Sequence, residues 1–158
     1  NIRRFIVPHK EHFATALKEI RAGQKHTHWS WYIFPTPPYI VNRRVAGSAE
    51  NQAFTLRDRP ASRTGYKAAK AYIQFGVTDG INLRQNYITI MKEINTQLNV
   101  KNIDPITLVG HMDVPKLVSS LNLFKEASSK NVDRDVHAAC ENALNALRNH
   151  GVDIDPLA

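Results

Sequence analysis

The sequence predicts a mainly α-helical protein, organised as a single compact domain of five to six helices with at most two or three short strands. Three observations lead to this fold class. Apolar residues recur at helical spacing in several separate segments of the chain. The length of 158 residues fits one domain, residues 1–158. No apolar run approaches the roughly 18 residues that a membrane span requires.

The first predicted helix covers residues 9–22. Phe13, Leu17 and Ile20 follow one another at three- and four-residue steps, which places them on one helical face. Gly23 follows directly, and glycine commonly ends a helix because it adopts the left-handed conformation without steric cost.

Later segments repeat this pattern. Further helices are predicted over residues 49–56, 66–75, 80–98, 113–124 and 132–149. Short polar side chains stand where these helices start and can accept hydrogen bonds from the free backbone amides; they are Ser48, then Asp79 or Asn82, and Asp113 with Pro115 in the first turn. Loops are predicted over residues 36–48 and 57–65, and the short apolar run 106–109 ends at Gly110.

The most distinctive stretch runs from Lys25 to Pro35 and contains both tryptophans of the protein, with four aromatic residues in six positions. In an extended conformation, alternate side chains point to opposite sides. Trp29, Trp31 and Ile33 would then share one side, and the opposite side would carry His28, Ser30, Tyr32 and Phe34. We expect the tryptophans to lie in the core, whereas a core and a ligand role stay equally open for His28 and Tyr32.

The positive charge of the chain is concentrated in its first half. Residues 1–75 contain 13 Lys and Arg against 4 Asp and Glu, a net charge of +9, while residues 76–158 contain 8 against 10, a net charge of −2. Such a charge favours an anionic partner: a nucleotide, a phosphorylated metabolite or nucleic acid. The alternative is that surplus Lys and Arg keep the protein soluble.

Cysteine and histidine usage argue against metal chemistry. The single cysteine, Cys140, excludes an internal disulfide framework and a multi-cysteine zinc site. His9 and His12 have a tolerable ligand spacing, but no carboxylate pattern accompanies them, so neither a metal nor a cofactor is expected. A reducing compartment and a cytoplasmic location are predicted. The chain starts at Asn1 without an apolar signal region and without Met, so it is processed or residues precede it.

Several segments resemble the bacterial domain of unknown function (DUF) family 1810. Ala16–Lys25 followed by the His-Trp-x-Trp-Tyr-Ile-Phe-Pro run at residues 28–35 is similar to the family signature. Three later segments are also similar to family segments, and the match covers about residues 5–127; they are Ala68–Ile73, Gly80–Arg84 and Asp113–Phe124. The loop at residues 36–47 departs from the family's Gln-Leu-x-Gly-Leu-Gly, and Phe75-Gly76 replaces His-Pro. The resemblance implies a fold and no particular activity.

A weaker similarity, in the order of elements, links the chain to the NADAR group, whose members handle ADP-ribose derivatives. Proteins of that group carry a glutamate that opens a helix after an aromatic segment, and Ser48–Phe54 is the matching stretch here. The resemblance makes Glu50 the candidate general acid or base for N-glycosidic hydrolysis. The alternative is a first-turn glutamate that stabilises its helix through the dipole.

The predicted ligand-binding residues combine aromatic rings, cations and small polar groups. Aromatic rings stack on any flat base, and Lys116 would meet an anion at a helix start with free amides. Ser119 and Ser120 would either pack against a neighbouring helix or reach a phosphate. The full set is Lys25, His28, Trp29, Trp31, Tyr32, Phe34, Arg43, Arg44, Asn51, Lys116, Ser119 and Ser120.

Three functions follow as hypotheses. The leading one is binding of an anionic small molecule of the ADP-ribose or NAD type, with hydrolysis as an open extension that would depend on Glu50. The second is a nucleic-acid-binding module that uses the basic half. The third is a non-catalytic interaction or structural subunit, with the arginines at 43–44 and 57–63 as docking points. No membrane partner is expected, and the oligomeric state stays open.

Overall fold

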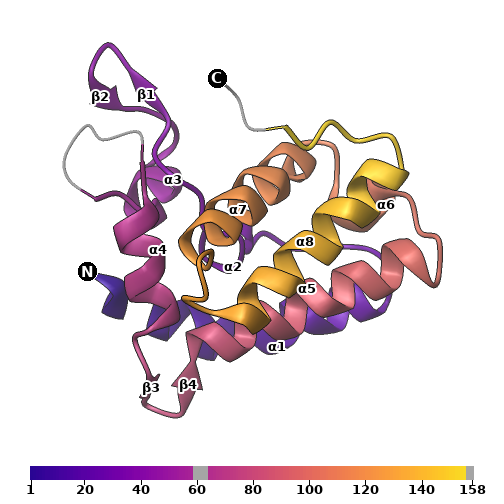
Figure 1. The fold of residues 1–158 in the computed structure, drawn as a ribbon, viewed down its shortest axis with the longest axis horizontal. Coiled ribbons are helices and arrows are strands. Elements are labelled where there is room, and N and C mark those ends of the chain that lie inside the picture. Colours follow the sequence, from indigo (N-terminus) through magenta and orange to yellow (C-terminus); the bar gives the residue numbers. More distant parts are fainter. Residues whose placement is uncertain (59–63, 156–158) are drawn as a thin grey trace.

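The structure is a computed structural model that describes residues 1–58 and 64–155 (Figure 1). Within these residues it contains eight α-helices, so the predicted mainly helical class is confirmed and the predicted number of five to six helices is too low. The helices are α1 Ile6–Arg21, α2 Ser30–Ile33, α3 Ala49–Phe54, α4 Tyr66–Ile73, α5 Leu83–Asn99, α6 Pro105–Val109, α7 Asp113–Ala127 and α8 Arg134–Asn149. A 3₁₀ helix, η1, covers Ile2–Phe5. The additional helices α2 and α6 are too short for a helical repeat to be visible in the sequence.

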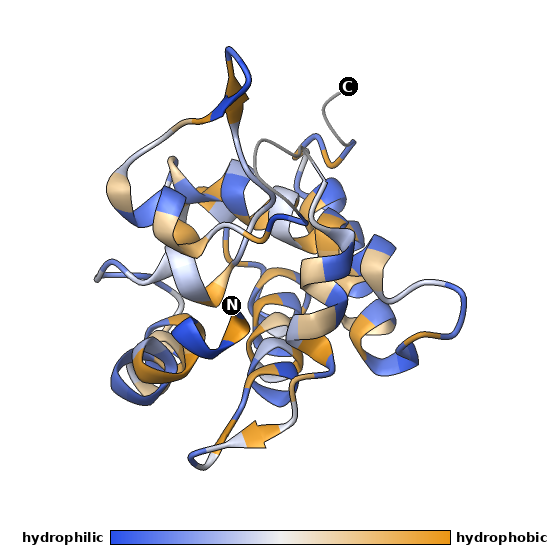
Figure 2. Cartoon of the chain, turned by 90° about the vertical axis from the view of Figure 1, so that its left-hand side faces the viewer, coloured by the Kyte–Doolittle hydropathy of each residue, from blue (hydrophilic) through white to orange (hydrophobic). Residues whose placement is uncertain are grey.

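The long helices form the body of the molecule. Helix α5 packs against α1 on one side and α8 on the other, α8 packs against α7, and α7 packs against α4 (Figure 1). Figure 2 shows that these helices carry both apolar and polar residues. In an amphipathic helix the apolar residues share one face and pack against the core. The buried core includes Ile20, Ile94, Leu121, Phe124 and Leu147, all with 0% of their surface exposed.

Two small hairpins project from this body (Figure 1). Strands β1 (Ile40–Val41) and β2 (Arg44–Val45) pair antiparallel, as do β3 (Val77–Thr78) and β4 (Ile81–Asn82). The prediction of an irregular loop over 36–48 is therefore wrong in part, and the described residues contain four strands instead of two or three. Asn42 and Arg43 both have positive φ, as the type I′ form of a two-residue hairpin turn requires. Of the predicted loop 57–65, residues 59–63 lie outside the described part.

Most predicted helix starts are confirmed by their hydrogen bonds. Ser48 Oγ accepts from the Asn51 amide at 3.2 Å, and Asn82 Oδ1 accepts from the Gln85 amide at 3.0 Å. Asn82, not Asp79, is thus the cap of α5. Asp113 does not cap α7, because the helix begins one residue earlier than predicted, with Met112 in the cap position.

Helix α1 begins at Ile6, three residues earlier than predicted, with Pro8 in its first turn where no intrahelical amide is needed. Its end agrees with the prediction. Gly23 has φ +85°, and its amide donates to Ile20 O at 2.9 Å while the Gln24 amide donates to Glu19 O at 3.1 Å. These two bonds satisfy carbonyls of the last turn and turn the chain sharply into the aromatic segment.

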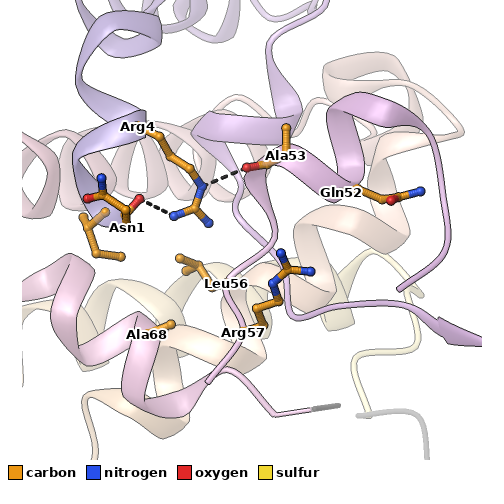
Figure 3. Close-up of a pocket in the computed structure, with 8 residues that line it drawn as sticks. Asn1, Arg4, Gln52, Ala53, Leu56, Arg57 and Ala68 are labelled. Atoms are coloured by element: carbon orange, nitrogen blue, oxygen red, sulfur yellow. Dashed lines mark hydrogen bonds between the residues drawn. The ribbon is translucent and has the colours of Figure 1, made fainter. Parts of the chain in front are cut away.

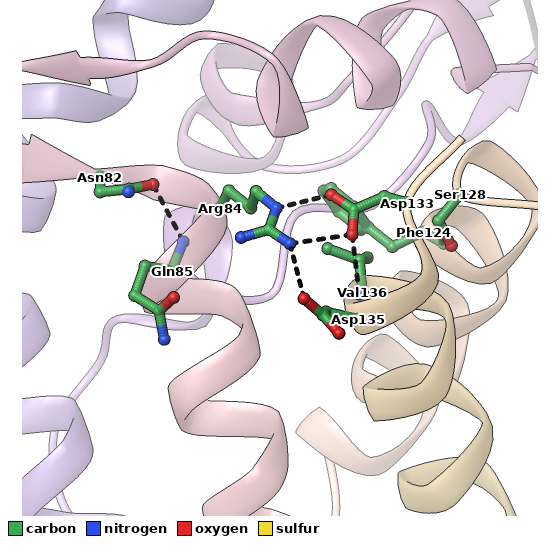
Figure 4. A network of polar contacts seen from close by, with 8 residues as sticks. All are labelled: Asn82, Arg84, Gln85, Phe124, Ser128, Asp133, Asp135 and Val136. Carbon is green, nitrogen blue, oxygen red and sulfur yellow. Dashed lines mark hydrogen bonds and ion pairs between the residues drawn. The ribbon is translucent and has the colours of Figure 1, made fainter. Parts of the chain in front are cut away.

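An ion-pair network joins the start of α5 to the start of α8 (Figure 4). Arg84 Nε donates to Asp133 Oδ2 at 2.6 Å and Arg84 Nη2 donates to Asp133 Oδ1 at 3.0 Å, a bidentate pair. Asp133 also caps α8 by accepting from the Val136 amide at 3.2 Å. Burial alone would raise the pKa of Asp133, but the hydrogen bond and charge of Arg84, together with the backbone amides of Val136 and Asp135, outweigh it and lower the pKa.

Arg84→Met is expected to lower the free energy of unfolding by about 2 kcal/mol, because it leaves a buried carboxylate without its cation. Urea denaturation measures this loss. In a double-mutant cycle with Asp133→Asn, the coupling should be at least about 1 kcal/mol. Arg148→Met, at the exposed end of α8, is the matched control and should cost less than about 0.5 kcal/mol. Equal losses in both arginine variants would contradict the prediction.

Candidate functional site

The aromatic segment is not extended, so the predicted alternation of its side chains is wrong. Residues Ser30–Ile33 form the single-turn helix α2, with Trp29 in the cap position. Trp29 is 1% exposed, Phe34 0% and Tyr32 8%, so these three rings belong to the core and offer no free face to a ligand. Trp31 is half-buried and His28 is exposed. The segment therefore presents Trp31 and its two histidines, His26 and His28, to solvent.

Glu19 holds the chain that leads into α2. Its Oε1 accepts hydrogen bonds from the His26 amide at 2.7 Å, the Thr27 amide at 2.9 Å and Trp29 Nε1 at 3.0 Å. Its Oε2 accepts from Thr27 Oγ1 at 2.6 Å. Burial alone would raise the pKa of Glu19, but these four donors outweigh it and lower the pKa to about 2. Glu19 is thus a charged anchor that orients Trp29.

A second anchor joins the aromatic segment to α7. Lys25 Nζ lies 3.0 Å from Asp113 Oδ2, and Ser30 Oγ donates to the same oxygen at 2.6 Å. The Lys25 side chain is 8% exposed and its ammonium sits 4.9 Å from the centre of the Trp29 ring. Lys25 is therefore neutralised within the fold, and the structure gives it no free face for a ligand phosphate.

Four predicted residues come together on the surface between α2, α3 and α7. The Lys116 ammonium lies 5.5 Å from the centre of the Trp31 ring and donates to Asn51 Oδ1 at 3.3 Å. The His28 ring centre is 6.3 Å from that of Trp31. Burial lowers the pKa of Lys116, Asp113 opposes this effect and Lys25 adds to it. We call His28, Trp31, Asn51 and Lys116 the Trp31 face.

The start of α7 is not an anion site of the kind predicted for Lys116. The amides of Asp113 and Val114 both donate to Gly110 O at 3.2 Å, and Pro115 has no amide hydrogen. The backbone amides of the first turn are therefore already hydrogen-bonded or, at Pro115, absent. An anion at Lys116 would thus be bound by side chains and not by free amides.

The remaining predicted residues lie apart from the Trp31 face or inside the protein. Glu50 is exposed in the first turn of α3, and Arg43 and Arg44 are exposed on the β1–β2 hairpin. Ser119 is half-buried, whereas Ser120 is 0% exposed and shares a 3.0 Å hydrogen bond with the Tyr87 hydroxyl. Ser120 thus has a packing role, one of the two alternatives that its sequence position left open.

His9 is a core histidine. Its Nε2 donates to Tyr32 O at 2.9 Å and lies 3.2 Å from the Tyr72 hydroxyl, while its Nδ1 accepts from Asn86 Nδ2 at 3.0 Å. Burial lowers the pKa of His9 to about 4, against the effect of the hydrogen bond to Tyr32. Both ring nitrogens of the neutral His9 are thus hydrogen-bonded, and the bond to Tyr32 O fixes the backbone at the end of α2. In the part of the chain that the structure describes, no group of three or more His, Cys, Asp or Glu residues is arranged to hold a metal.

Sequence reasoning missed the residues that support the face. Glu19, Ser30 and Asp113 had no assigned role in the site, although each makes hydrogen bonds that position the aromatic segment. The available signal was an ionisable residue at the end of the helix before the aromatic run, and a second one three positions before Lys116. Neither signal identifies its partner. The partners of Glu19 reach it only because the chain turns back at Gly23, and Ser30 and Asp113 are 83 residues apart in the sequence.

The fold and this face define a small α-helical domain built around a buried aromatic segment. Residues 1–147 match the family described as "Protein of unknown function (DUF1810)", and the chain belongs to this family. It is also similar to the crystal structure of the conserved hypothetical protein Rv1873 from Mycobacterium tuberculosis, with a TM-score of 0.67 and 21% sequence identity over 94% of this chain and 92% of that one. This likeness shows the fold. Among curated proteins, none matches. None of the described helices is both long and apolar enough to cross a bilayer.

Proposed function

We propose that the chain binds a nucleotide of the ADP-ribose or NAD type at the Trp31 face. One observation carries the proposal: an ammonium group lies beside an accessible aromatic ring, and its direct hydrogen-bond partner is a neutral amide. Lys116 is 5.5 Å from the Trp31 ring and 3.3 Å from Asn51 Oδ1. A ring that stacks a base next to a cation that binds phosphate matches the two chemical parts of a nucleotide.

The surroundings support an anionic ligand. The first 75 residues have a net charge of +9, and the Asp113 carboxylate that could neutralise Lys116 is already bound by Lys25 and Ser30. Lys116 is half-buried, so a phosphate there would meet a partly desolvated cation, and such interactions are stronger than those in open water.

Isothermal titration with ADP-ribose, NAD and ADP tests the proposal. Trp31→Ala should weaken binding at least about fivefold, because base stacking on an aromatic ring is worth about 1–3 kcal/mol. Lys116→Gln should weaken it by a similar factor, because it removes the cation that binds the phosphate. The matched controls are Tyr39→Ala, which removes an aromatic ring that is 69% exposed, and Lys70→Gln, which removes an exposed lysine of α4. Both controls should change affinity less than twofold. Binding that is equally weak in variants and controls would contradict the site, and no binding by the folded wild type would overturn the proposal.

Hydrolysis is a separable extension of this function. Glu50 lies next to Asn51 in the first turn of α3, where the resemblance to the NADAR group would have the acid or base. If the chain cleaves an N-glycosidic bond, Glu50→Gln should abolish turnover and leave the affinity unchanged. Unchanged turnover would remove Glu50 from the mechanism.

A second function, nucleic-acid binding, is favoured by the β1–β2 hairpin. It projects from the body (Figure 1) and exposes Tyr39, Arg43 and Arg44. Affinity for a short DNA duplex should then fall steeply with salt, because phosphate contacts release counterions. Weak salt dependence would count against this function. If neither nucleotides nor DNA bind, the third function, a non-catalytic interaction or structural subunit, would be favoured.

A further inference from the structure

A cavity of about 430 Å³ opens beside η1 and α3 (Figure 3). Its size is in the range of sites that hold small metabolites. Its walls combine two arginines with apolar and amide side chains. The residues that line it are Asn1, Ile2, Arg4, Gln52, Ala53, Leu56, Arg57 and Ala68.

Arg4 is held in place by backbone carbonyl groups. Its Nε donates to Ala53 O at 2.8 Å, Nη2 donates to Thr55 O at 2.6 Å, and Nη1 donates to Asn1 O. Three of the five guanidinium hydrogens are thus used, and two remain. The acceptors are neutral, so they fix the orientation of the group and leave its positive charge uncompensated.

Arg57 brings a second positive charge to the same cavity. Its side chain and that of Arg4 both line the cavity (Figure 3). Burial, followed by the charge of Arg57, lowers the pKa of Arg4. Within the described ranges 1–58 and 64–155, no carboxylate lines the cavity and neither arginine forms an ion pair.

The acidic residue next in the sequence does not neutralise this pair. Asp58 Oδ1 accepts from the Ala68 amide at 3.0 Å, and Asp58 Oδ2 accepts from Thr64 Oγ1 at 2.8 Å. Its carboxylate therefore belongs to the start of α4. Two guanidinium groups around one cavity without a carboxylate repel each other, and a doubly charged oxyanion between them would convert this repulsion into attraction.

We propose that this cavity binds the phosphate group of a small phosphorylated metabolite, between Arg4 and Arg57. Planar guanidinium groups match phosphate oxygens in geometry and in charge. Ala53 and Ala68, which also line the cavity, offer small apolar groups to the rest of the molecule. The site is separate from the Trp31 face in its residues: Asn51 of α3 contacts Lys116, whereas its neighbours Gln52 and Ala53 line the cavity.

Titration of the full chain with inorganic phosphate, followed by nitrogen-proton NMR, tests this proposal. The Arg4 and Arg57 Nε signals should shift together and saturate. Arg57→Gln should weaken the phosphate affinity at least tenfold; it is the main variant because Arg57 is exposed, whereas Arg4 also supports the fold through its backbone contacts. Arg21→Gln, an exposed arginine of the same basic half, is the matched control and should change the affinity less than twofold.

Each other outcome overturns the proposal. Equal weakening by Arg57→Gln and Arg21→Gln would mean general electrostatic attraction only. Saturable binding of citrate without binding of phosphate would mean that the cavity binds a carboxylate ligand instead of a phosphate. If neither anion saturates the signals, the cavity is not an anion-binding site. The Nε signals of Arg4 and Arg57 report on the cavity alone, so phosphate that binds at the Trp31 face does not count toward this test.

Discussion

Replacing Glu19 with Gln is expected to lower the free energy of unfolding by about 3 kcal/mol at pH 7. The substitution keeps the shape of the side chain and removes the charge that four donors hold. These bonds lower the pKa of Glu19 from 4.5 to about 2. Because one pKa unit corresponds to about 1.4 kcal/mol, the difference amounts to about 3 kcal/mol of preference for the charged form. Urea denaturation at pH 7 measures the loss.

The same carboxylate makes stability depend on pH in a defined range. Its pKa is lower in the folded than in the unfolded chain, so the unfolded chain binds more protons as the pH falls below about 4.5. The stabilisation from Glu19 is complete above that pH and is lost as the pH falls toward about 2. Glu19→Gln should remove this part of the acid dependence. Glu11→Gln, an exposed glutamate of the same helix, is the control and should cost less than about 0.5 kcal/mol; a comparable loss there would contradict the role of Glu19.

Lowering the pH from 7 to 4 is expected to lower the free energy of unfolding by about 3 kcal/mol through the protonation of His9. Burial lowers the pKa of this histidine from 6.5 to about 4, so the folded protein prefers the neutral ring. The unfolded chain takes up the proton first, and stability falls as the pH drops from about 6.5 to about 4. Below that range the folded protein is protonated as well, and the contribution of His9 levels off.

NMR titration of the histidine ring protons gives the direct measurement, with a pKa of about 4 expected for His9. Urea denaturation at pH 7 and pH 4.5 gives the energetic one. His9→Leu should lower the stability at pH 7, because Tyr32 O and Asn86 lose their partner, and should show a smaller further loss at pH 4.5. His12→Gln, exposed on the same helix, should keep the wild-type acid dependence. A His9 ring that titrates near 6.5 would contradict the prediction.

The positions of these two anchors could not be read from the sequence. Glu19 lies in a helix of predicted amphipathic pattern, and nothing in that pattern distinguishes it from the exposed Glu11. Its role comes from the turn at Gly23, which brings the chain back over the end of α1. His9 likewise becomes a core residue because Tyr32 and Asn86 reach it from 23 and 77 residues away.

The candidate site was likewise predicted in part from the sequence and decided in part by the tertiary structure. The sequence indicated that rings, cations and small polar groups of the first half form one site with Lys116. Of these, His28, Trp31 and Asn51 do lie near Lys116 on the Trp31 face. The prediction of an extended segment, however, placed Trp29 and Trp31 on the same side and therefore in the same surroundings. The single turn of α2 separates them, so that Trp29 is buried and Trp31 is half-exposed. A turn of four residues has no visible repeat in the sequence, because it is stabilised by its tertiary contacts.

The sequence by itself determined the helical class, the six helices α1, α3, α4, α5, α7 and α8, and the cap at Ser48. These features depend on spacing and on side chains within a few residues of one another, where the geometry is set locally. The tertiary structure decided which tryptophan is exposed, that Lys25 is paired with Asp113, and that Arg4 and Arg57 share a cavity. Each of these features depends either on contacts between groups at least 50 positions apart or on the burial of a side chain. The energy of such a contact, and the energy of burial, is defined only once the chain has folded and brought the groups together.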